Sequence, residues 1–215
     1  MEIVVALRGA VAVVGRFPVL AGADLDVARG EILLLQGPNG AGKTSLLRAL
    51  AGLLPIERGE ARVLGTDVVR AREEVRNKVG LLGHTNGLYL DLTVRQNVSF
   101  WGEMVGASSN EIASVMDRMK LSERLADVRA SQLSAGQKRR CALASLIVRR
   151  AQLWLLDEPH AGLDAVGRDE LDDTLRQVVN SGATVVLASH EHERASQLAT
   201  RIVTVYGGVV HGGTL

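Results

Sequence analysis

Two kinds of strand-like pattern open this chain. Residues 3–7 and 10–14 form short apolar runs, and residues 23–27 alternate apolar with polar side chains, as a half-exposed strand does. Residues 32–35 are uniformly apolar, which predicts a strand buried on both faces. The leucines of 43–54 recur with helical spacing, so we expect a helix there.

The middle of the chain has a different pattern. From about residue 86 to residue 150, runs of β-branched residues become rare, and 111–119 and 141–148 have the spacing of helices. We therefore expect residues 86–150 to form a helical subdomain, inserted into a core made of 1–85 and 151–215.

The last third returns to strands. Residues 153–156 and 184–188 are apolar and predict buried strands, and a helix is expected between them at about 166–179. A strand, a helix and a strand at this spacing predict parallel pairing through a right-handed crossover. The fold class is therefore α/β.

Composition supports this class. Among 215 residues, 47% are hydrophobic but only 3% are aromatic, so Leu, Val, Ile and Ala must build the core. The net charge of +1 excludes the strong basic field of a dedicated nucleic-acid-binding protein. The short basic run at 138–140 is then a solvated helix face or a contact to an anion.

Cysteine usage and hydropathy suggest where the protein works. The one cysteine, Cys141, cannot form a disulfide within the chain, which fits a reducing compartment, and its apolar surroundings predict a small buried side chain. No segment approaches 18 apolar residues, and residues 1–5 lack the pattern of a signal peptide. We therefore expect a cytoplasmic protein, tethered by another chain if it works at a membrane.

A glycine-rich loop is the strongest chemical signal. Residues 37–44 fit G-x-x-x-x-G-K-[ST], between a predicted buried strand and a predicted helix. Backbone N–H groups of such a loop and of the helix N-terminus converge on phosphate, while Lys43 reaches the β- and γ-phosphates and Thr44 can bind Mg²⁺. An incidental glycine turn would not explain the Gly-Lys-Thr ending. The candidate ATP-binding residues are Gly37, Pro38, Asn39, Gly40, Ala41, Gly42, Lys43, Thr44 and Ser45.

Two acids follow the predicted strand 153–156. Asp157 and Glu158 would lie at the carboxyl edge of a parallel sheet, where ligand sites of α/β proteins gather. Asp157 can hold Mg²⁺, and Glu158 can orient and polarise the attacking water. The alternative is a solvated strand end before a turn at Pro159, but the phosphate loop upstream favours the catalytic interpretation.

A histidine occupies the equivalent place after the strand 184–188. His190 could contact the γ-phosphate and hold the transition-state geometry. The alternatives are a surface or capping histidine at this position, and His192 as the functional one. His192 lies further from the strand end, so we favour His190 as catalytic, together with Glu158 and Lys43.

A second helix N-terminus suits an anion. Ser134 is a good N-cap for a helix that begins near Lys138, and Gly136 keeps the backbone open. One triphosphate rarely needs two such ends, so we expect a head-to-tail dimer in which each nucleotide lies between two chains. The alternative is a plain capped helix. The candidates for binding ATP in trans are Ser134, Ala135, Gly136 and Gln137.

With these segments in this order, the chain resembles the ATP-binding subunits of ABC transporters over nearly its whole length. By this resemblance, residues 37–45 are the Walker A segment, LSAGQ at 133–137 is the signature, and 153–157 is Walker B. Residues 161–164, with Asp164, match the D-loop, and His190 matches the switch histidine.

The resemblance implies a specific fold and activity. The fold is a P-loop NTPase of ABC type: a mainly parallel sheet, an N-terminal antiparallel β element and an inserted helical subdomain. The reaction is hydrolysis of ATP, bound with Mg²⁺, in a homodimer that drives integral membrane permeases. The expected place is peripheral, at the cytoplasmic face of the inner membrane.

The sequence departs from the family pattern at two places. His84 occupies the position of the Q-loop glutamine, after a strand at 79–82. The aromatic residue that stacks on adenine has no clear match, but Phe17 is a candidate, and Arg16 could stack instead.

The first departure points to a subfamily. Leu82-Gly83-His84, LSAGQ followed by Lys-Arg-Arg, and the Walker B segment resemble the haem-exporter ATPases of cytochrome c biogenesis, the CcmA type. This resemblance implies CcmB- and CcmC-like partners. His84 fits a loop beside Mg-ATP better than a haem ligand.

Three rival functions stay open at this stage. The first is an ABC subunit for another exported substrate, such as a drug, lipid or polysaccharide. The second is an ABC-like ATPase of DNA repair or chromosome structure, but such proteins place long coiled coils between Walker A and the signature, and no sustained heptads occur here. The third is a non-hydrolysing regulatory module, which the presence of Glu158 and His190 argues against.

Overall fold

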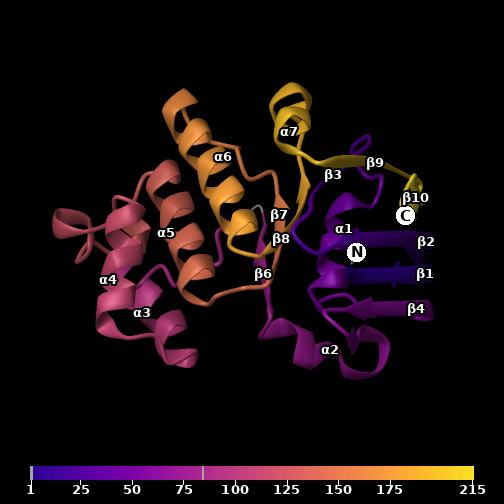
Figure 1. The fold of residues 1–215 in the computed structure, drawn as a ribbon, viewed down its shortest axis with the longest axis horizontal. Coiled ribbons are helices and arrows are strands. Elements are labelled where there is room, and N and C mark those ends of the chain that lie inside the picture. The colour runs from indigo at the N-terminus through magenta and orange to yellow at the C-terminus, as the bar shows by residue number, and fades with distance from the viewer. Residues whose placement is uncertain (1, 84) are drawn as a thin grey trace.

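The computed structural model describes residues 2–83 and 85–215, and within them the strands form two sheets (Figure 1). The first sheet has four strands in the order β2-β1-β4-β5, and the second has six in the order β10-β9-β3-β8-β7-β6. The first contains β1 (Ile3–Val14), β2 (Phe17–Ala28), β4 (Arg58–Val63) and β5 (Thr66–Asp67). The second contains β3 (Ile32–Gln36), β6 (Val79–Leu82), β7 (Leu153–Asp157), β8 (Thr184–Ala188), β9 (Arg201–Tyr206) and β10 (Val209–His211).

The six-stranded sheet confirms the predicted parallel core. β3 pairs in parallel with β8 and β9, and β7 pairs in parallel with β6 and β8, so the carboxyl ends of these strands share one edge. Only β10 runs antiparallel, against β9, among the described strands of this sheet. The sheet therefore brings the loops after β3, β6, β7 and β8 to a single edge.

Both faces of this sheet are covered, which explains its uninterrupted apolar strands. Along β3, Leu33 and Leu35 pack with the leucines of α1 (Lys43–Leu50) and with the four-stranded sheet. Ile32 and Leu34 pack on the opposite face, against the helices of the middle of the chain and α6 (Ala165–Asn180). Period-two alternation thus places successive residues of one strand in two separate cores.

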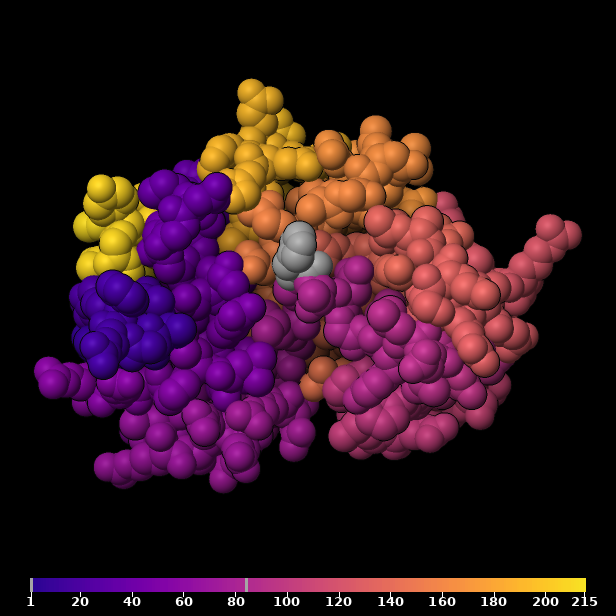
Figure 2. Space-filling view, turned by 180° about the vertical axis from the view of Figure 1, so that it is seen from behind, coloured from indigo at the N-terminus to yellow at the C-terminus, as the bar shows by residue number. Residues whose placement is uncertain are grey.

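The helices α3 (Val94–Met104), α4 (Ser109–Arg118) and α5 (Ala135–Val148) lie together on one side of the molecule, and β1, β2 and β4 lie on the other side (Figure 1). Figure 2 shows the same division from behind, with the C-terminal segment beside the N-terminal strands. The boundaries 86 and 150 of the helical subdomain stay a prediction. The remaining helices of the described residues are α2 (Val68–Arg76), α7 (His192–Leu198) and two 3₁₀ turns, η1 (Glu123–Leu125) and η2 (Ala130–Gln132).

The antiparallel element confirms one prediction and corrects another. Residues 3–7 and 10–14 are one strand, β1, because the pairing with β2 shifts register between Leu7 and Val11 instead of ending there. Gly9 N–H donates to Asp24 Oδ1 at 2.8 Å across this irregularity. A β-bulge interrupts the apolar pattern while the strand continues. The pairing of β1 with β2 continues through these register shifts, so the predicted strand 23–27 is only the end of the long strand β2.

Two helix boundaries were predicted wrongly. The first helix ends at Leu50 and does not reach residue 54, because Leu53 and Leu54 N–H both donate to Arg48 O and close a turn. The helix of the signature begins at Ala135 and not near Lys138. The other predicted helices, 111–119, 141–148 and 166–179, overlap α4, α5 and α6.

Cys141 is buried in α5, as predicted. Burial raises the pKa of its thiol to about 12, so the thiol is protonated and unreactive at neutral pH. Across residues 2–83 and 85–215, none of the helices combines the length and the apolar character that crossing a membrane requires.

Candidate functional site

The loop 37–42 connects β3 to α1 and packs against two neighbouring strands. Gly37 and Gly42 have φ angles of 142° and 109°, which side-chain-bearing residues rarely adopt. A Cβ atom at Gly37 would lie 2.1 Å from Val205 O, and one at Gly42 would lie 2.6 Å from Val19 O. Glycine is therefore required at both positions for the loop to close on β9 and β2.

Lys43 begins α1 and turns back over this loop. Its side chain is buried, and Nζ donates to Gly37 O at 2.7 Å and to Pro38 O at 3.0 Å. No side chain among the described residues caps the N-terminus of α1, where Gly42 is the N-cap. An ammonium group and a helix N-terminus thus meet in one glycine loop, an arrangement that suits a polyanionic ligand.

Thr44 and Asp157 meet across the sheet edge. Thr44 Oγ1 donates to Asp157 Oδ2 at 2.8 Å, although the residues are 113 positions apart in sequence. A hydroxyl and a carboxylate are hard oxygen ligands of the kind that Mg²⁺ prefers. The predicted metal ligands are therefore neighbours, and their chemistry fits this ion beside the phosphate loop.

Glu158 and His190 also come together. Asp157 pairs with Ala188, so the residues that follow β7 and β8 are adjacent. The backbone N–H of His190 donates to Glu158 Oε2 at 3.1 Å, and the ring nitrogen Nε2 of His190 lies 3.5 Å from Glu158 Oε1. The competing candidate, His192, begins α7 and lies edge-to-face with the His190 ring, 6.5 Å between centroids.

The backbone of Glu158 has an unusual conformation. Its φ angle is 49°, in the left-handed region that favours glycine, and this costs on the order of 1–2 kcal/mol. Its N–H donates to Ala188 O at 2.9 Å, and its carbonyl oxygen accepts from Ala161 N–H at 3.1 Å. The carboxylate therefore points toward His190 from a turn that needs outside support.

Arg139 supplies part of that support, and the sequence did not indicate it. The run 138–140 was expected to be solvated or in contact with an anion, but Arg139 is only 4% exposed. Its guanidinium donates to Glu158 O, Gly83 O and Asn86 Oδ1. The helical phase set by Ser134 could have identified it, because Arg139 lies on the buried face of Ala142 and Leu146.

Burial lowers the pKa of Arg139, while the charges of Asp157 and Glu158 oppose that shift. The guanidinium nevertheless stays charged near neutral pH, because the ordinary pKa of an arginine lies far above that range. A buried positive charge therefore stands behind the two carboxylates of the site.

The signature segment is a capped helix end. Ser134 Oγ accepts from Gln137 N–H at 3.2 Å, and Gln137 Oε1 accepts from Ser134 N–H at 2.9 Å. This capping box explains why α5 begins at Ala135. A Cβ at Gly136 would lie 3.6 Å from Leu163 Cδ2, an ordinary van der Waals distance, so the signature and the D-loop lie side by side.

The signature and the D-loop line a common hollow. A cavity of about 620 Å³ is bordered by residues 134–137 and 162–164, together with parts of α4 and α6. Asp164 N-caps α6 through a hydrogen bond from Gly167 N–H at 2.8 Å. Within the described part of the chain, none of the residues 37–45 lines this cavity. The two predicted anion-binding segments therefore face different spaces.

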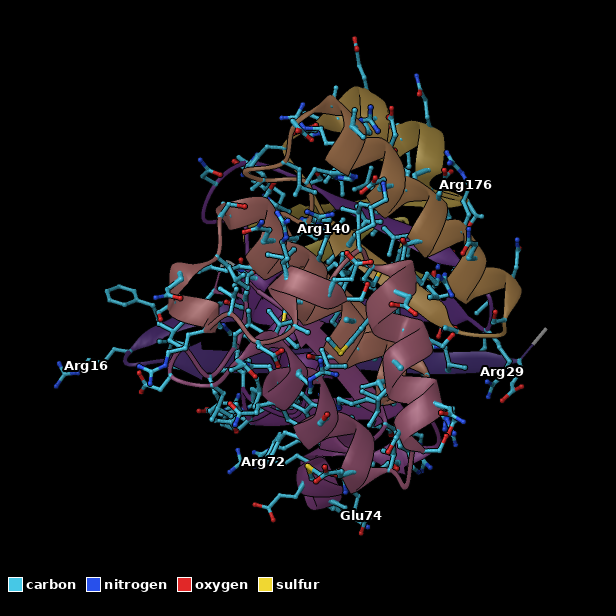
Figure 3. The ribbon with its side chains drawn as sticks, turned by 90° about the vertical axis from the view of Figure 1, so that its left-hand side faces the viewer. Arg16, Arg29, Arg72, Glu74, Arg140 and Arg176 are labelled. Atoms are coloured by element: carbon cyan, nitrogen blue, oxygen red, sulfur yellow. The ribbon has the colours of Figure 1, made fainter. Side chains whose placement is uncertain are left out.

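The two remaining candidates contribute less. Phe17 begins β2 and is 77% exposed, two residues before the Val19 carbonyl that contacts the glycine loop. Its neighbour Arg16 extends away from the body of the molecule (Figure 3). The prediction for His84 lies outside the described residues.

Comparisons with known proteins agree on a family. The family model described as "ABC transporter" matches residues 20–161. The daunorubicin resistance ATP-binding protein DrrA3 of Streptomyces coeruleorubidus is 40% identical over 91% of this chain and 63% of its own length. The cytochrome c biogenesis ATP-binding export protein CcmA of Ruegeria pomeroyi is 39% identical over 82% of this chain and 79% of its own length.

A third relative is the Nod factor export ATP-binding protein I of Rhizobium meliloti, 36% identical over 90% of this chain and 59% of its own length. This chain thus spans less than two thirds of the drug-resistance and Nod factor relatives. Among solved structures, an ATP-binding subunit of an ABC transporter superposes with a TM-score of 0.88 at 24% identity, over 96% of this chain and 88% of that one.

A dimeric ATP-binding cassette, described as a post-hydrolysis state bound to ADP and Pi, superposes with a TM-score of 0.87 at 24% identity. The match covers 96% of each chain. At this identity the structural neighbours establish the fold alone, and they confirm the α/β architecture expected from the sequence.

Proposed function

Because this chain belongs to the ABC transporter family, as one of its ATP-binding domains, we propose that it hydrolyses ATP to drive a membrane permease. One observation carries the proposal: Thr44 of the glycine loop and Asp157 after β7, far apart in sequence, lie within 2.8 Å of each other. This contact joins the phosphate-binding half of the site to the half that bears Glu158 and His190.

Residues 37–45 hold the triphosphate. The loop amides and the N-terminus of α1 donate to phosphate oxygens, and the Lys43 ammonium leaves the carbonyls of Gly37 and Pro38 to pair with the β- and γ-phosphates. When bound with ATP, Mg²⁺ would neutralise phosphate charge. Thr44 Oγ1 and Asp157 Oδ2, which lie 2.8 Å apart, are the oxygens that would hold it.

Glu158 and His190 act at the γ-phosphate. The Glu158 carboxylate accepts a hydrogen bond from the attacking water and so aims the water oxygen at phosphorus. The new P–O bond forms as the bond to the β,γ-bridging oxygen breaks, and the proton of the water passes to the Glu158 carboxylate, which leaves ADP and inorganic phosphate. The backbone N–H of His190 orients the Glu158 carboxylate, and the imidazole of His190 donates to a γ-phosphate oxygen.

The signature acts on the nucleotide of a second copy. Residues 134–137 form a capped helix end that borders a different space from the glycine loop of the same chain. A head-to-tail homodimer brings this end to the partner's phosphate loop, and Asp164 of the D-loop lies beside it. Phe17, or Arg16 in its place, stacks on adenine, and His84 takes the place of the Q-loop glutamine.

For the transported substrate, we propose haem export in cytochrome c biogenesis, with CcmB- and CcmC-like permeases at the cytoplasmic face of the inner membrane. The LSAGQ signature and the Leu-Gly-His segment support this choice. CcmA relatives at 36–39% identity support it too, and this chain covers 77–79% of their length. Relatives described as acting in drug resistance and Nod factor export are about as similar, so another exported substrate is the second candidate.

The test of hydrolysis is Glu158→Gln. The amide keeps the size and most contacts but cannot accept a proton from water, so we expect phosphate release to fall at least about 100-fold while ATP still binds. Unchanged turnover would refute Glu158 as the catalytic carboxylate. For the substrate, membrane proteins that co-purify with the tagged chain are identified: CcmB- and CcmC-like permeases support haem export, and an unrelated permease refutes it.

A further inference from the structure

A buried arginine on α5 reaches the backbone of the carboxylate that we propose to be catalytic. We propose that Arg139 is a positioning residue, which fixes the peptide of Glu158 and thereby aims its carboxylate at the γ-phosphate of ATP. The proposal rests on the proposed function and adds a residue to its machinery.

The guanidinium connects three segments that are distant in sequence. Nη2 donates to Glu158 O at 2.5 Å, and Nη1 donates to Gly83 O and to Asn86 Oδ1, each at 3.2 Å. Gly83 and Asn86 belong to the loop after β6, and Glu158 follows β7. A planar fork with several N–H donors can serve these acceptors together, whereas a single ammonium group cannot.

The hydrogen bond from Arg139 to Glu158 O supports a strained part of the backbone. Glu158 has a φ angle of 49°, a strained conformation for a residue with a side chain. Its carbonyl accepts from Arg139 and from Ala161 N–H, and its own N–H donates to Ala188 O. These bonds hold the peptide units on both sides of the Glu158 Cα atom, and hence the direction of its side chain toward His190.

Keeping this cation buried is costly. Arg139 is 4% exposed, and a charge removed from water destabilises the fold unless hydrogen bonds and opposite charges compensate. Here the compensating groups are two backbone carbonyls, the Asn86 amide oxygen and the nearby carboxylates of Asp157 and Glu158. An apolar side chain would pack at this position without that cost, so the charge serves the site and not the core.

Arg149, the C-cap residue of α5, provides a matched comparison. Arg149 is also partly buried, its guanidinium donates to Arg76 O at 3.0 Å, and it lies 4.2 Å from the ring centroid of Trp101. None of its described hydrogen bonds reaches Asp157, Glu158 or His190. Each replacement removes an arginine that donates to backbone carbonyls, Arg139 within α5 and Arg149 at its C-terminal end, but only Arg139 contacts the site.

The experiment measures steady-state ATP hydrolysis of the full chain with Arg139→Met and with Arg149→Met, together with the thermal midpoint of each. Met keeps most of the volume and loses the donors. For Arg139→Met we expect kcat to fall at least about tenfold and KM to change less than about threefold, because alignment of the water is lost and ATP binding is not. For Arg149→Met we expect kcat within about twofold of the unmodified chain despite a lower midpoint.

A double-mutant cycle with Glu158→Gln tests whether Arg139 acts through Glu158. If it does, Arg139→Met reduces the residual turnover of the Glu158→Gln chain by less than about twofold, because the group that it positions is already gone. If the two losses multiply instead, Arg139 acts independently of Glu158 and the proposal is wrong.

The outcomes separate this proposal from the function beneath it. Undiminished turnover in Glu158→Gln refutes the proposed function itself. Loss of turnover in Glu158→Gln together with wild-type kcat in folded Arg139→Met refutes only the positioning role. If Arg139→Met does not fold, Arg139→Lys decides: we expect kcat to fall at least about threefold, and a wild-type kcat contradicts the proposal.

Discussion

The N-termini of α1 and α5 are both anion-binding candidates, yet they are built differently. α1 begins at Lys43 behind a glycine N-cap with no side-chain cap in the described residues, whereas α5 begins at Ala135 behind a reciprocal box of Ser134 and Gln137. An uncapped end leaves N–H donors for a ligand, and a capped end satisfies part of them within the chain.

We propose that this difference gives the two ends different roles. In the proposed function, the α1 end gains its missing hydrogen bonds from phosphate, so ATP binding depends on it. The α5 end is capped within the chain and, in the proposed dimer, presents a fixed surface to a second chain. Loss of the first should therefore affect binding, and loss of the second should affect both stability and turnover.

The largest effect is expected at the α1 end. Lys43→Met removes the ammonium group that we assign to the β- and γ-phosphates, and a charge-assisted contact of this kind contributes about 2–3 kcal/mol. We expect the Kd for ATP, measured by calorimetry, to rise about 100-fold. Arg48→Met on the exposed side of the same helix is the control and should leave Kd unchanged. If Lys43→Met still bound ATP tightly, the assignment of the α1 end to the nucleotide site would be wrong.

The next effect concerns the histidine after β8. His190→Ala keeps the backbone N–H that donates to Glu158 but removes the imidazole, whose Nε2 lies 3.5 Å from Glu158 Oε1. The proposed γ-phosphate contact is lost with the ring, so we expect kcat to fall about 30-fold with ATP affinity nearly intact. His192→Ala is the matched control, because His192 is the first residue of α7 and no described hydrogen bond joins His192 to Glu158. If His192→Ala lost more turnover than His190→Ala, the assignment of the two histidines would be reversed.

A smaller effect on stability is expected at the N-terminus of α5, where it helps to distinguish helix capping by Ser134 from a contact between Ser134 and a partner's nucleotide. Ser134→Ala removes an N-cap, which lowers the free energy of unfolding by about 1 kcal/mol. Ser108→Ala removes the equivalent cap of α4, built from the same kind of box with Glu111, and should cost about the same. Denaturant titration checks both.

Turnover should distinguish these two serines. We expect Ser134→Ala to lose about tenfold in kcat and Ser108→Ala to lose none, because we propose a contact with the partner's nucleotide for Ser134 alone. Equal turnover in the two variants would make the signature a plain capped helix, the alternative that the sequence left open.

The smallest effect is expected in the interior of α5. Burial raises the pKa of the Cys141 thiol to about 12, so the reactive thiolate is almost absent at pH 8. We expect iodoacetamide at pH 8 to leave the folded chain unmodified by mass spectrometry and its turnover unchanged. Rapid alkylation would show that α5 opens in solution, contrary to the fixed end described above.

The same comparison shows what the sequence could and could not predict. Local patterns predicted the loop at 37–44, the buried strands and the pair Asp157 and Glu158, because each is a contiguous segment with its own chemistry. The bulge in β1 divided one strand into two apparent ones, since a register shift interrupts alternation. The strands β4, β5, β9 and β10 were not predicted. Each has six residues or fewer, and its place in a sheet is set by pairing, β4 with β1 and β9 with β3.

Arg139 is the clearest residue that the sequence hid. A basic run is ordinarily solvated, and only tertiary packing turns its middle member toward Gly83, Asn86 and Glu158. The helical phase set by Ser134 was available, but placing the helix start near Lys138 obscured it. Site residues whose role can be recognised from one contiguous segment were predictable. Arg139 was not, because its role arises from contacts among three segments that are distant in sequence.

The central claim is that each ATP lies between the α1 end of one chain and the α5 end of another. The most direct test is an experimental structure of the Glu158→Gln chain with ATP and Mg²⁺. We predict a γ-phosphate bounded by Lys43 of one protomer and Ser134 of its partner. A nucleotide held by one protomer alone, or bound away from Lys43, would contradict the claim.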